Sequence, residues 1–264
     1  MKRGERILVV TMLGFWVLLI GATLGSILFS PPETTHIAAE SPTKPEGVSA
    51  EVVTQVDTKL VEYQSMVAEL TAKYQGQEYA IAVKHFADPT RDFAVNGDRS
   101  MSAASTYKLF TAYTMLKSGY APSCLETMII NSDNACPENY GNWWGTTTDA
   151  RALGATNTDL NSVITTTTAN DLVIFLTKLY DGSLLAPADN ERLLNAMKIQ
   201  IFREGIPSGI PDALVANKVG FLDGVLNDAA IVYSPKGDFA LVILTDGYSW
   251  QSIAETTAEI YAKM

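Results

Sequence analysis

Ser105 and Lys108 are a pair of residues whose types and spacing could do chemistry. They lie in SAASTYKLFTAYTML, residues 102–116, where small residues followed by apolar ones predict a helix. Three positions correspond to about 300° around a helix, so the lysine amine can reach the serine hydroxyl. Burial lowers the pKa of a lysine, and a neutral amine can act as the general base that makes a serine nucleophilic. The pair alone is weak support, because about one S-x-x-K arises by chance in a chain of this length.

Two later motifs strengthen the prediction that Ser105 is a nucleophile with Lys108 as its base. Residues 131–134, NSDN, fall in a break between helical segments, where Ser132 and Asn134 can direct a hydroxyl and an amide into a cleft. Lys218, Val219 and Gly220 lie in a strand pattern further along the chain. A glycine in such a strand allows a ligand backbone to approach closely.

The elements that must position these residues can be read from the pattern. An amphipathic helix is predicted through residue 74, the central block 103–200 is largely helical, and 249–263 form a last helix. Strands are predicted at residues 78–86, 91–96, 214–221, 226–235 and 238–246. This order predicts an α+β domain over residues 50–264: an antiparallel five-stranded sheet built from both ends, flanked by the terminal helices, with an all-helical lobe. A small-molecule site is expected in a cleft between sheet and lobe.

The N-terminal segment predicts a membrane anchor. Residues 7–29 contain no charge, and at about 1.5 Å per residue they form a helix of roughly 34 Å, enough to cross about 30 Å of hydrocarbon. Three basic residues against one acidic residue in 1–6 keep this tail in the cytoplasm and export the rest. The alternative is a cleaved signal peptide, but the apolar run exceeds the usual length of about 7 to 15 residues. Residues 30–49, with four prolines, predict a disordered linker between the cell membrane and an extracytoplasmic domain.

Charge and composition exclude several classes of partner. The 264 residues carry a formal net charge of −10, and the first 30 contribute +2, which leaves −12 on the exported part. Such an acidic surface argues against nucleic acid or anionic lipid as a partner. There are two histidines and two cysteines, with His36 in the linker and His85 in a strand, so we predict no metal site and no cofactor.

Cys124 and Cys136 bracket the NSDN motif. A disulfide is permitted in an exported domain, and closing so small a loop would contribute about 3 kcal/mol while fixing the turn at Ser132 to Asn134. Two buried thiols are the alternative.

The three motifs, S-x-x-K, S-D-N and K-x-G in this order, resemble those of the active-site serine penicillin-recognising enzymes, the β-lactamases and penicillin-binding proteins. Residues 217–247, NKVGFLDGVLNDAAIVYSPKGDFALVILTDG, are most similar to class A β-lactamases. The resemblance spans about residues 50–264. It implies that Ser105 is the acylated nucleophile and Lys108 its activating base.

The same resemblance implies roles for the other motif residues. Ser132 would pass a proton to the leaving nitrogen, and Asn134 would bind the amide carbonyl of the substrate. Lys218 would support Ser132 and attract the substrate carboxylate. The backbone N–H groups of Ser105 and Phe221 would form the oxyanion hole. Val219 and Gly220 would line the substrate-binding surface beside Phe221. Asp133 would be a structural hydrogen-bonding residue.

The sequence departs from the family pattern at two positions. The middle residue of the family's K-T-G carries a hydroxyl that contacts the substrate carboxylate, and Val219 lacks it, at a cost of about 1.5 to 3 kcal/mol or roughly ten- to a hundredfold in recognition. Class A enzymes also use a loop glutamate to activate water against the acyl-enzyme. In this sequence Asn157 stands where the family has that glutamate. Asp159 is the acidic candidate for the same role in this stretch, and it is better explained as a turn residue. The run 153–158 matches penicillin-binding peptidases at least as well.

Aromatic residues follow the NSDN motif. The stretch between Lys108 and Ser132 is shorter than in typical class A enzymes, so one wall of the cleft is missing or rebuilt. Tyr140, Trp143 and Trp144 could supply aromatic cleft surface, and anchoring of the core or of a loop is the alternative.

Three functions follow from these observations. The first is a membrane-anchored serine hydrolase that forms an acyl-enzyme with a β-lactam or a D-alanyl-type peptide. The second is a pseudoenzyme that binds cell-wall peptide without turnover. The third is a structural ectodomain in which the motifs are coincidental, and the presence of all three motifs argues against it.

Overall fold

The computed structural model describes the backbone of residues 50–264 and the side chains of residues 58–264. The predicted tail 1–6, membrane helix 7–29 and linker 30–49 lie outside the described residues. Among the helices that are described, none combines the length and the apolar character needed to cross a membrane.

The main sheet has five strands in the order β2-β1-β7-β6-β5, and all neighbouring strands are antiparallel. Its strands are β1 (Tyr79–His85), β2 (Phe93–Val95), β5 (Leu214–Leu222), β6 (Val225–Tyr233) and β7 (Phe239–Asp246). β1 pairs with β7 so that Ile81 lies opposite Ile243, which joins the first strand of the domain to the last. The prediction of one antiparallel sheet assembled from both ends of the domain is therefore confirmed.

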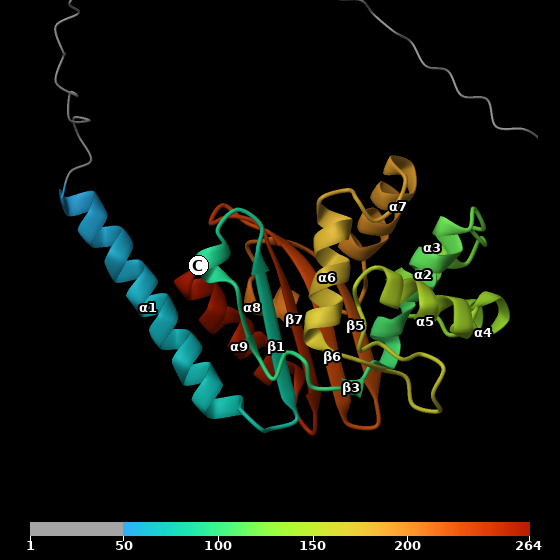
Figure 1. Cartoon of the computed structure of the whole chain (residues 1–264), viewed down its shortest axis with the longest axis horizontal. Helices are drawn as coiled ribbons and strands as arrows, with labels where there is room; N and C mark the ends of the chain where they lie inside the picture. The colour runs from blue at the N-terminus through green and yellow to red at the C-terminus, as the bar shows by residue number, and fades with distance from the viewer. Residues whose placement is uncertain (1–49) are drawn as a thin grey trace, which may run out of the picture. The chain divides into compact units, whose positions relative to one another are not determined.

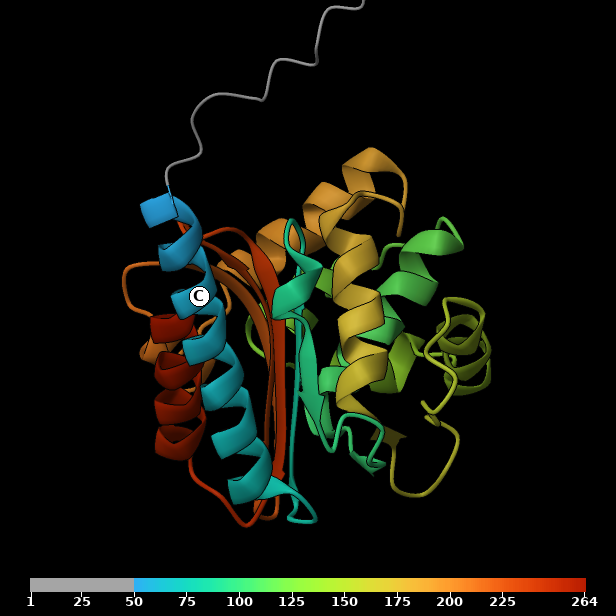
Figure 2. The same cartoon turned by 60° about the vertical axis from the view of Figure 1, so that its left-hand side comes forward.

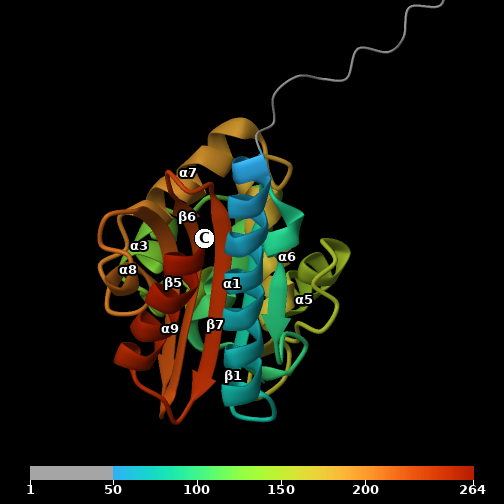
Figure 3. The ribbon, with the colours of Figure 1, turned by 90° about the vertical axis from the view of Figure 1, so that its left-hand side faces the viewer.

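Helices cover both faces of this sheet (Figures 1 and 2). The helices on one face are α1 (Ala50–Tyr74), α8 (Ile206–Gly209) and α9 (Trp250–Lys263). α1 and α9 run side by side across it (Figure 3). The helices of the other face and of the lobe are α2 (Tyr107–Lys117), α3 (Leu125–Ile130), α4 (Ala135–Tyr140), α5 (Trp143–Ala152), α6 (Ala169–Tyr180) and α7 (Pro187–Lys198). This arrangement confirms the predicted terminal helices and helical lobe.

Strand β7 shows why the sheet is buried on both faces. Successive side chains of a strand point to opposite faces, and every residue from 239 to 244 is apolar and buried. Ala240, Val242 and Leu244 join the core beneath the helical lobe. The residues between them, beginning with Phe239 and Leu241, join the core beneath α1 and α9.

The region before the first lobe helix differs from the prediction. Residues 102–116 were expected to form one helix, but Met101–Ser102 form a short strand, β3, paired with β4 (Thr166–Thr167). A 3-10 turn, η2 (Ala104–Thr106), follows, and the α-helix begins only at Tyr107. Ala104 has a φ of +40°, outside the right-handed helical region, so the helix cannot extend back through it.

Candidate active site

Ser105 lies at the centre of the turn η2, immediately before α2. Two hydrogen bonds of Ala103 hold the turn. Thr106 Oγ1 donates to the carbonyl of Ala103 at 2.6 Å, and the N–H of Ala103 donates to Thr165 O at 2.8 Å. Asn227 of β6 also donates to the backbone before the turn, to Ser102 O at 2.8 Å. The Ser105 side chain is half-buried. These contacts fix the serine at a helix N-terminus, where negative charge is favoured.

Lys108 is completely buried, and its amine lies among side chains of two motifs. Nζ lies 3.0 Å from Ser105 Oγ, 2.6 Å from Ser132 O and 2.6 Å from Asn134 Oδ1. Burial lowers the pKa of Lys108 from 10.5 to about 8, although the negative charges of Asp133 and Glu138 act in the opposite direction. The structure thus brings together the serine and the lysine as their spacing predicted.

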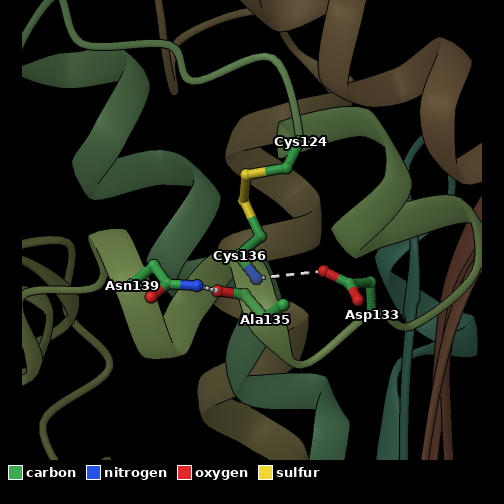
Figure 4. The surroundings of a disulfide bond; sticks show 5 residues. All are labelled: Cys124, Asp133, Ala135, Cys136 and Asn139. Carbon is green, nitrogen blue, oxygen red and sulfur yellow. Dashed lines mark hydrogen bonds between the residues drawn. A yellow bond between two sulfur atoms is a disulfide. The ribbon is translucent and has the colours of Figure 1, made fainter.

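The Ser132 to Asn134 segment forms the connection between α3 and α4. Ser132 has a φ of +56°, a left-handed conformation that non-glycine residues seldom adopt. Asp133 Oδ2 accepts a hydrogen bond from the N–H of Cys136 at 2.9 Å, which agrees with its expected structural role. The predicted disulfide between Cys124 and Cys136 is present, so the segment is closed by a covalent bond (Figure 4).

Lys218 reaches the same place from strand β5. It is completely buried, and Nζ donates to Ser132 Oγ at 2.9 Å and to Val219 O at 2.8 Å. Burial lowers the pKa of Lys218 well below its ordinary value, and the nearby charge of Lys108 lowers it further. Ser132 Oγ therefore lies between two lysine amines, with Lys108 Nζ 3.4 Å away.

Gly220 is required by the protein itself. A Cβ at this position would lie 2.9 Å from Ala103 O and 2.9 Å from Ser105 N. The backbone that fills the space beside this glycine belongs to the turn that carries Ser105, and the approach of a ligand backbone to it stays a prediction. The glycine brings β5 against Ser105.

Phe221 follows Gly220 and presents its N–H at the outer edge of the sheet. The Val219 N–H donates to Gln200 Oε1 rather than to β6, and residues two apart in a strand turn their N–H groups the same way. The N–H of Phe221 therefore also points away from β6, at the free edge of β5. The Phe221 side chain is exposed and packs edge-on against Phe202, with ring centroids 5.3 Å apart.

Val219 does not contribute a side chain to this surface. Its side chain is completely buried, so the expectation that it lines the substrate-binding surface is corrected. Asn134, in contrast, is exposed and lies at the edge of the site.

The loop that precedes β4 provides no base directed at Ser105. Asp159 Oδ1 accepts from Asn161 N at 3.0 Å and Oδ2 from Ser162 Oγ at 2.8 Å, so the carboxylate is bound within its own turn. These bonds, chiefly the one from Asn161, lower its pKa. Asn157 is exposed, and its N–H donates to the buried carboxylate of Asp171 at 2.9 Å. The bonds of Asp159 to Asn161 and Ser162 agree with the role of a turn residue that was expected for it.

The aromatic residues after the NSDN motif divide between the two expected roles. Trp143 is half-buried and packs against Tyr107, with ring centroids 5.0 Å apart, so it anchors α5 to the start of α2. Trp144 is 75% exposed and Tyr140 is 49% exposed, so both leave aromatic surface open to solvent.

Gln200 and Asn227 are buried parts of the site that the sequence did not reveal. Both side chains form hydrogen bonds to backbone atoms. Asn227 connects β6 to the chain before Ser105, and Gln200 connects α3 to β5. Asn227 lies in the segment 217–247 that carries the resemblance, which could have marked it. Gln200 lies in no motif and has no comparable signal.

The chain resembles known proteins in sequence and in fold. The model of the β-lactamase enzyme family, Beta-lactamase2, matches residues 62–121 and 120–263. No curated protein matches the chain.

Several solved structures have a similar fold. PBP-A is 20% identical, with a TM-score of 0.67, and the match covers 76% of this chain and 94% of that chain. A β-lactamase from Sphaerobacter thermophilus is 16% identical, with a TM-score of 0.64 and coverage of 77% and 95%. A variant of the class A β-lactamase of the last common ancestor of Gram-negative bacteria is 22% identical, with a TM-score of 0.65 and coverage of 76% and 97%. At these identities the likeness establishes a shared fold.

Proposed function

The chain belongs to the β-lactamase enzyme family of serine hydrolases, and on this premise we propose that Ser105 forms an acyl-enzyme with β-lactams or related amides. The observation that supports this most strongly is the buried Lys108 amine, 3.0 Å from Ser105 Oγ. A buried lysine with a lowered pKa beside a serine is the arrangement that general-base activation requires.

The neighbours of Lys108 suit the neutral amine. A neutral amine has two N–H groups and one lone pair. Ser132 O and Asn134 Oδ1 are both acceptors, so they take the two N–H groups. The lone pair then faces the hydroxyl of Ser105.

Acylation then proceeds in three proton transfers. Ser105 Oγ bonds to the carbonyl carbon while its proton moves to Lys108 Nζ. The N–H groups of Ser105 and Phe221 are disposed to stabilise the resulting oxyanion. The C–N bond breaks as Ser132 gives its proton to the nitrogen and regains one from Lys108, while Lys218 holds Ser132 Oγ at 2.9 Å.

Asn134 is suited to bind the amide carbonyl of the substrate. Its side-chain oxygen already accepts from Lys108, so its nitrogen, which carries two N–H groups, is the end left to donate. The residue is exposed, as a substrate-binding group must be.

The loop at Asp159 favours slow release of the acyl group. Its carboxylate is bound to Asn161 and Ser162, and the position matched to the family's glutamate is Asn157. This is the observation behind a second candidate, a penicillin-binding protein of the D-alanyl-D-alanine peptidase type. PBP-A is a related case: one of its mutants, with a TM-score of 0.66 and 20% identity to this chain, was solved as an acyl-enzyme complex with penicillin G.

The test is covalent labelling of the purified full chain with a fluorescent penicillin. We expect a stable adduct on wild type and on Ser65→Ala, which removes an exposed serine on α1, and none on Ser105→Ala. A label that persists for hours supports the slow acyl-enzyme, and rapid turnover of a chromogenic cephalosporin contradicts it. A folded protein that takes no label, but binds cell-wall peptide reversibly, would instead be the pseudoenzyme.

We also propose that residues 7–29 anchor the domain on the outer side of the cell membrane. Support comes from the uncharged apolar run and the basic residues before it. Membrane fractionation with mass spectrometry of the N-terminus tests this. Recovery of the intact N-terminus in the membrane fraction is expected, and a mature protein beginning within 30–49 would mean a cleaved signal peptide.

A further inference from the structure

Gln200 is a buried amide that joins two of the motif-bearing elements. It is 2% exposed and follows α7 by two residues. Nε2 donates to Ile129 O in α3 at 3.1 Å. Oε1 accepts from the N–H of Val219 in β5 at 3.1 Å and from Asn217 Nδ2 at 3.1 Å. One side chain therefore makes three hydrogen bonds to two elements far apart in the sequence.

The orientation of this amide follows from its partners. A backbone N–H can only donate and a backbone carbonyl can only accept, so Oε1 must face Val219 N and Nε2 must face Ile129 O. Asn217 is oriented in the same way, because its Oδ1 accepts from Arg203 at 2.7 Å and its Nδ2 faces Gln200 and Asp228. The network has one consistent arrangement, so it holds its members rigidly.

The atoms held by Gln200 lie close in sequence to the two ends of one catalytic contact. Ile129 precedes Ser132 by three residues, and Asn217 and Val219 flank Lys218 on both sides. The Ser132 Oγ to Lys218 Nζ distance is 2.9 Å, yet the two residues lie on different elements. A second bond, from Ile201 N to Ile130 O at 3.1 Å, ties the same segment to the end of α3.

We propose that Gln200 is a positioning residue that sets the Ser132–Lys218 contact and thereby controls proton delivery to the leaving group. The proposal rests on the acyl-transfer function above. Gln200 acts through backbone that it fixes on both sides. Its effect belongs to the step in which the C–N bond breaks and the Ser132 proton goes to the nitrogen.

This role predicts a dependence on the leaving group. An amide nitrogen must be protonated as it departs, so a displaced Ser132 slows acylation by penicillin. An aryl thiolate, whose conjugate acid has a low pKa, leaves without a proton. Acylation by an aryl thioester of phenylacetylglycine should therefore be much less sensitive to Gln200. A residue with a merely structural role would slow both reactions equally.

The test compares both acylation rates in three variants of the full chain. Gln200→Met keeps the length of the side chain and removes its hydrogen bonds. We expect it to lower acylation by penicillin about ten- to a hundredfold, the effect of leaving buried polar groups unpaired, and acylation by the thioester less than about threefold. Asn190→Ala is the matched control, because it removes a buried amide that donates to Leu179 O in another part of the lobe, and it should affect neither rate.

Gln200→Glu provides a second measurement if the methionine variant folds poorly. Glutamate keeps the acceptor for Val219 N–H, but the ionised carboxylate has no donor for Ile129 O. Burial at this position raises the pKa of a carboxyl group, and protonation restores a donor. The selective loss with penicillin should therefore shrink as the pH is lowered from 8 to 6, relative to wild type. The charged groups around this network are Lys218, Asp228 and Arg203, and all of them are also present in the wild-type reference.

Two results would overturn the proposal. One is equal slowing of penicillin and thioester in either Gln200 variant, and the other is no slowing of either. Both leave the proposed function intact, provided that wild type is labelled. A wild type that takes no label with either substrate would instead reject the proposed function itself.

Discussion

The rate of acylation should rise steeply between pH 6 and pH 8 because only neutral Lys108 can accept the Ser105 proton. Burial lowers the pKa of this lysine to about 8. About 1% of the amine is then neutral at pH 6, about 10% at pH 7 and about half at pH 8. The second-order rate constant for labelling by penicillin should therefore increase about fiftyfold from pH 6 to pH 8 and level off above pH 9. This constant reports the pKa of the free enzyme.

The contribution of neighbouring charges to the pKa of Lys108 can be tested at an exposed residue. Glu138 raises the pKa of Lys108 by its negative charge, and its side chain lies at the surface of α4. Glu138→Gln should shift the rising limb to lower pH and leave the plateau rate unchanged. The shift should diminish in high salt, because salt screens the interaction of exposed charges.

The assay is stopped-flow or quenched labelling at low ionic strength from pH 5.5 to pH 9.5, with folding checked at each pH. A rate that stays level from pH 6 to pH 8 would refute the role of neutral Lys108. The reasoning would also be refuted if Glu138→Gln left the rising part of the pH–rate profile unchanged or shifted it to higher pH.

Two further predictions concern the backbone around the nucleophile. Gly220→Ala should slow acylation and destabilise the fold by about 1 to 3 kcal/mol, since its Cβ would lie 2.9 Å from Ala103 O and Ser105 N. Denaturant unfolding and labelling measure both, and unchanged values would contradict the close contact. Replacing Cys124 and Cys136 together by serine should cost about 3 kcal/mol and slow labelling, because the Ser132 segment is freed. Equal stability and rate in the oxidised protein and the variant would argue against this.

The fold could be predicted because its strands and terminal helices are encoded locally. Strand β7 is an unbroken apolar run between turns, and Asp223-Gly224, with φ values of +43° and +93°, makes the two-residue turn that joins β5 and β6. The start of α2 could not be predicted in this way. Met101 and Ser102 pair with Thr166 and Thr167, and such a contact between distant residues overrides local helical preference.

The site could be predicted only as far as its motifs extend. The spacing of Ser105 and Lys108 predicted their contact, and the family resemblance of the three motifs implied that Ser132, Asn134 and Lys218 would join them. The burial of Val219 and the backbone that fills the space beside Gly220 depend on how β5 packs, which no spacing encodes.

The burial of Lys108 argues that the motifs are there for chemistry. A fall in pKa from 10.5 to about 8 means that folding works against the charged amine, at a cost of about 3 kcal/mol. The cost is present in full below pH 8, where the unfolded lysine is charged, and it disappears as the pH rises to about 10.5. A buried apolar side chain at this position would avoid the cost in stability. A domain with a purely structural role could carry such a side chain. The lysine instead contacts Ser105 and Asn134. The stability lost at neutral pH accompanies the lowered pKa that the proposed role of Lys108 as a general base requires.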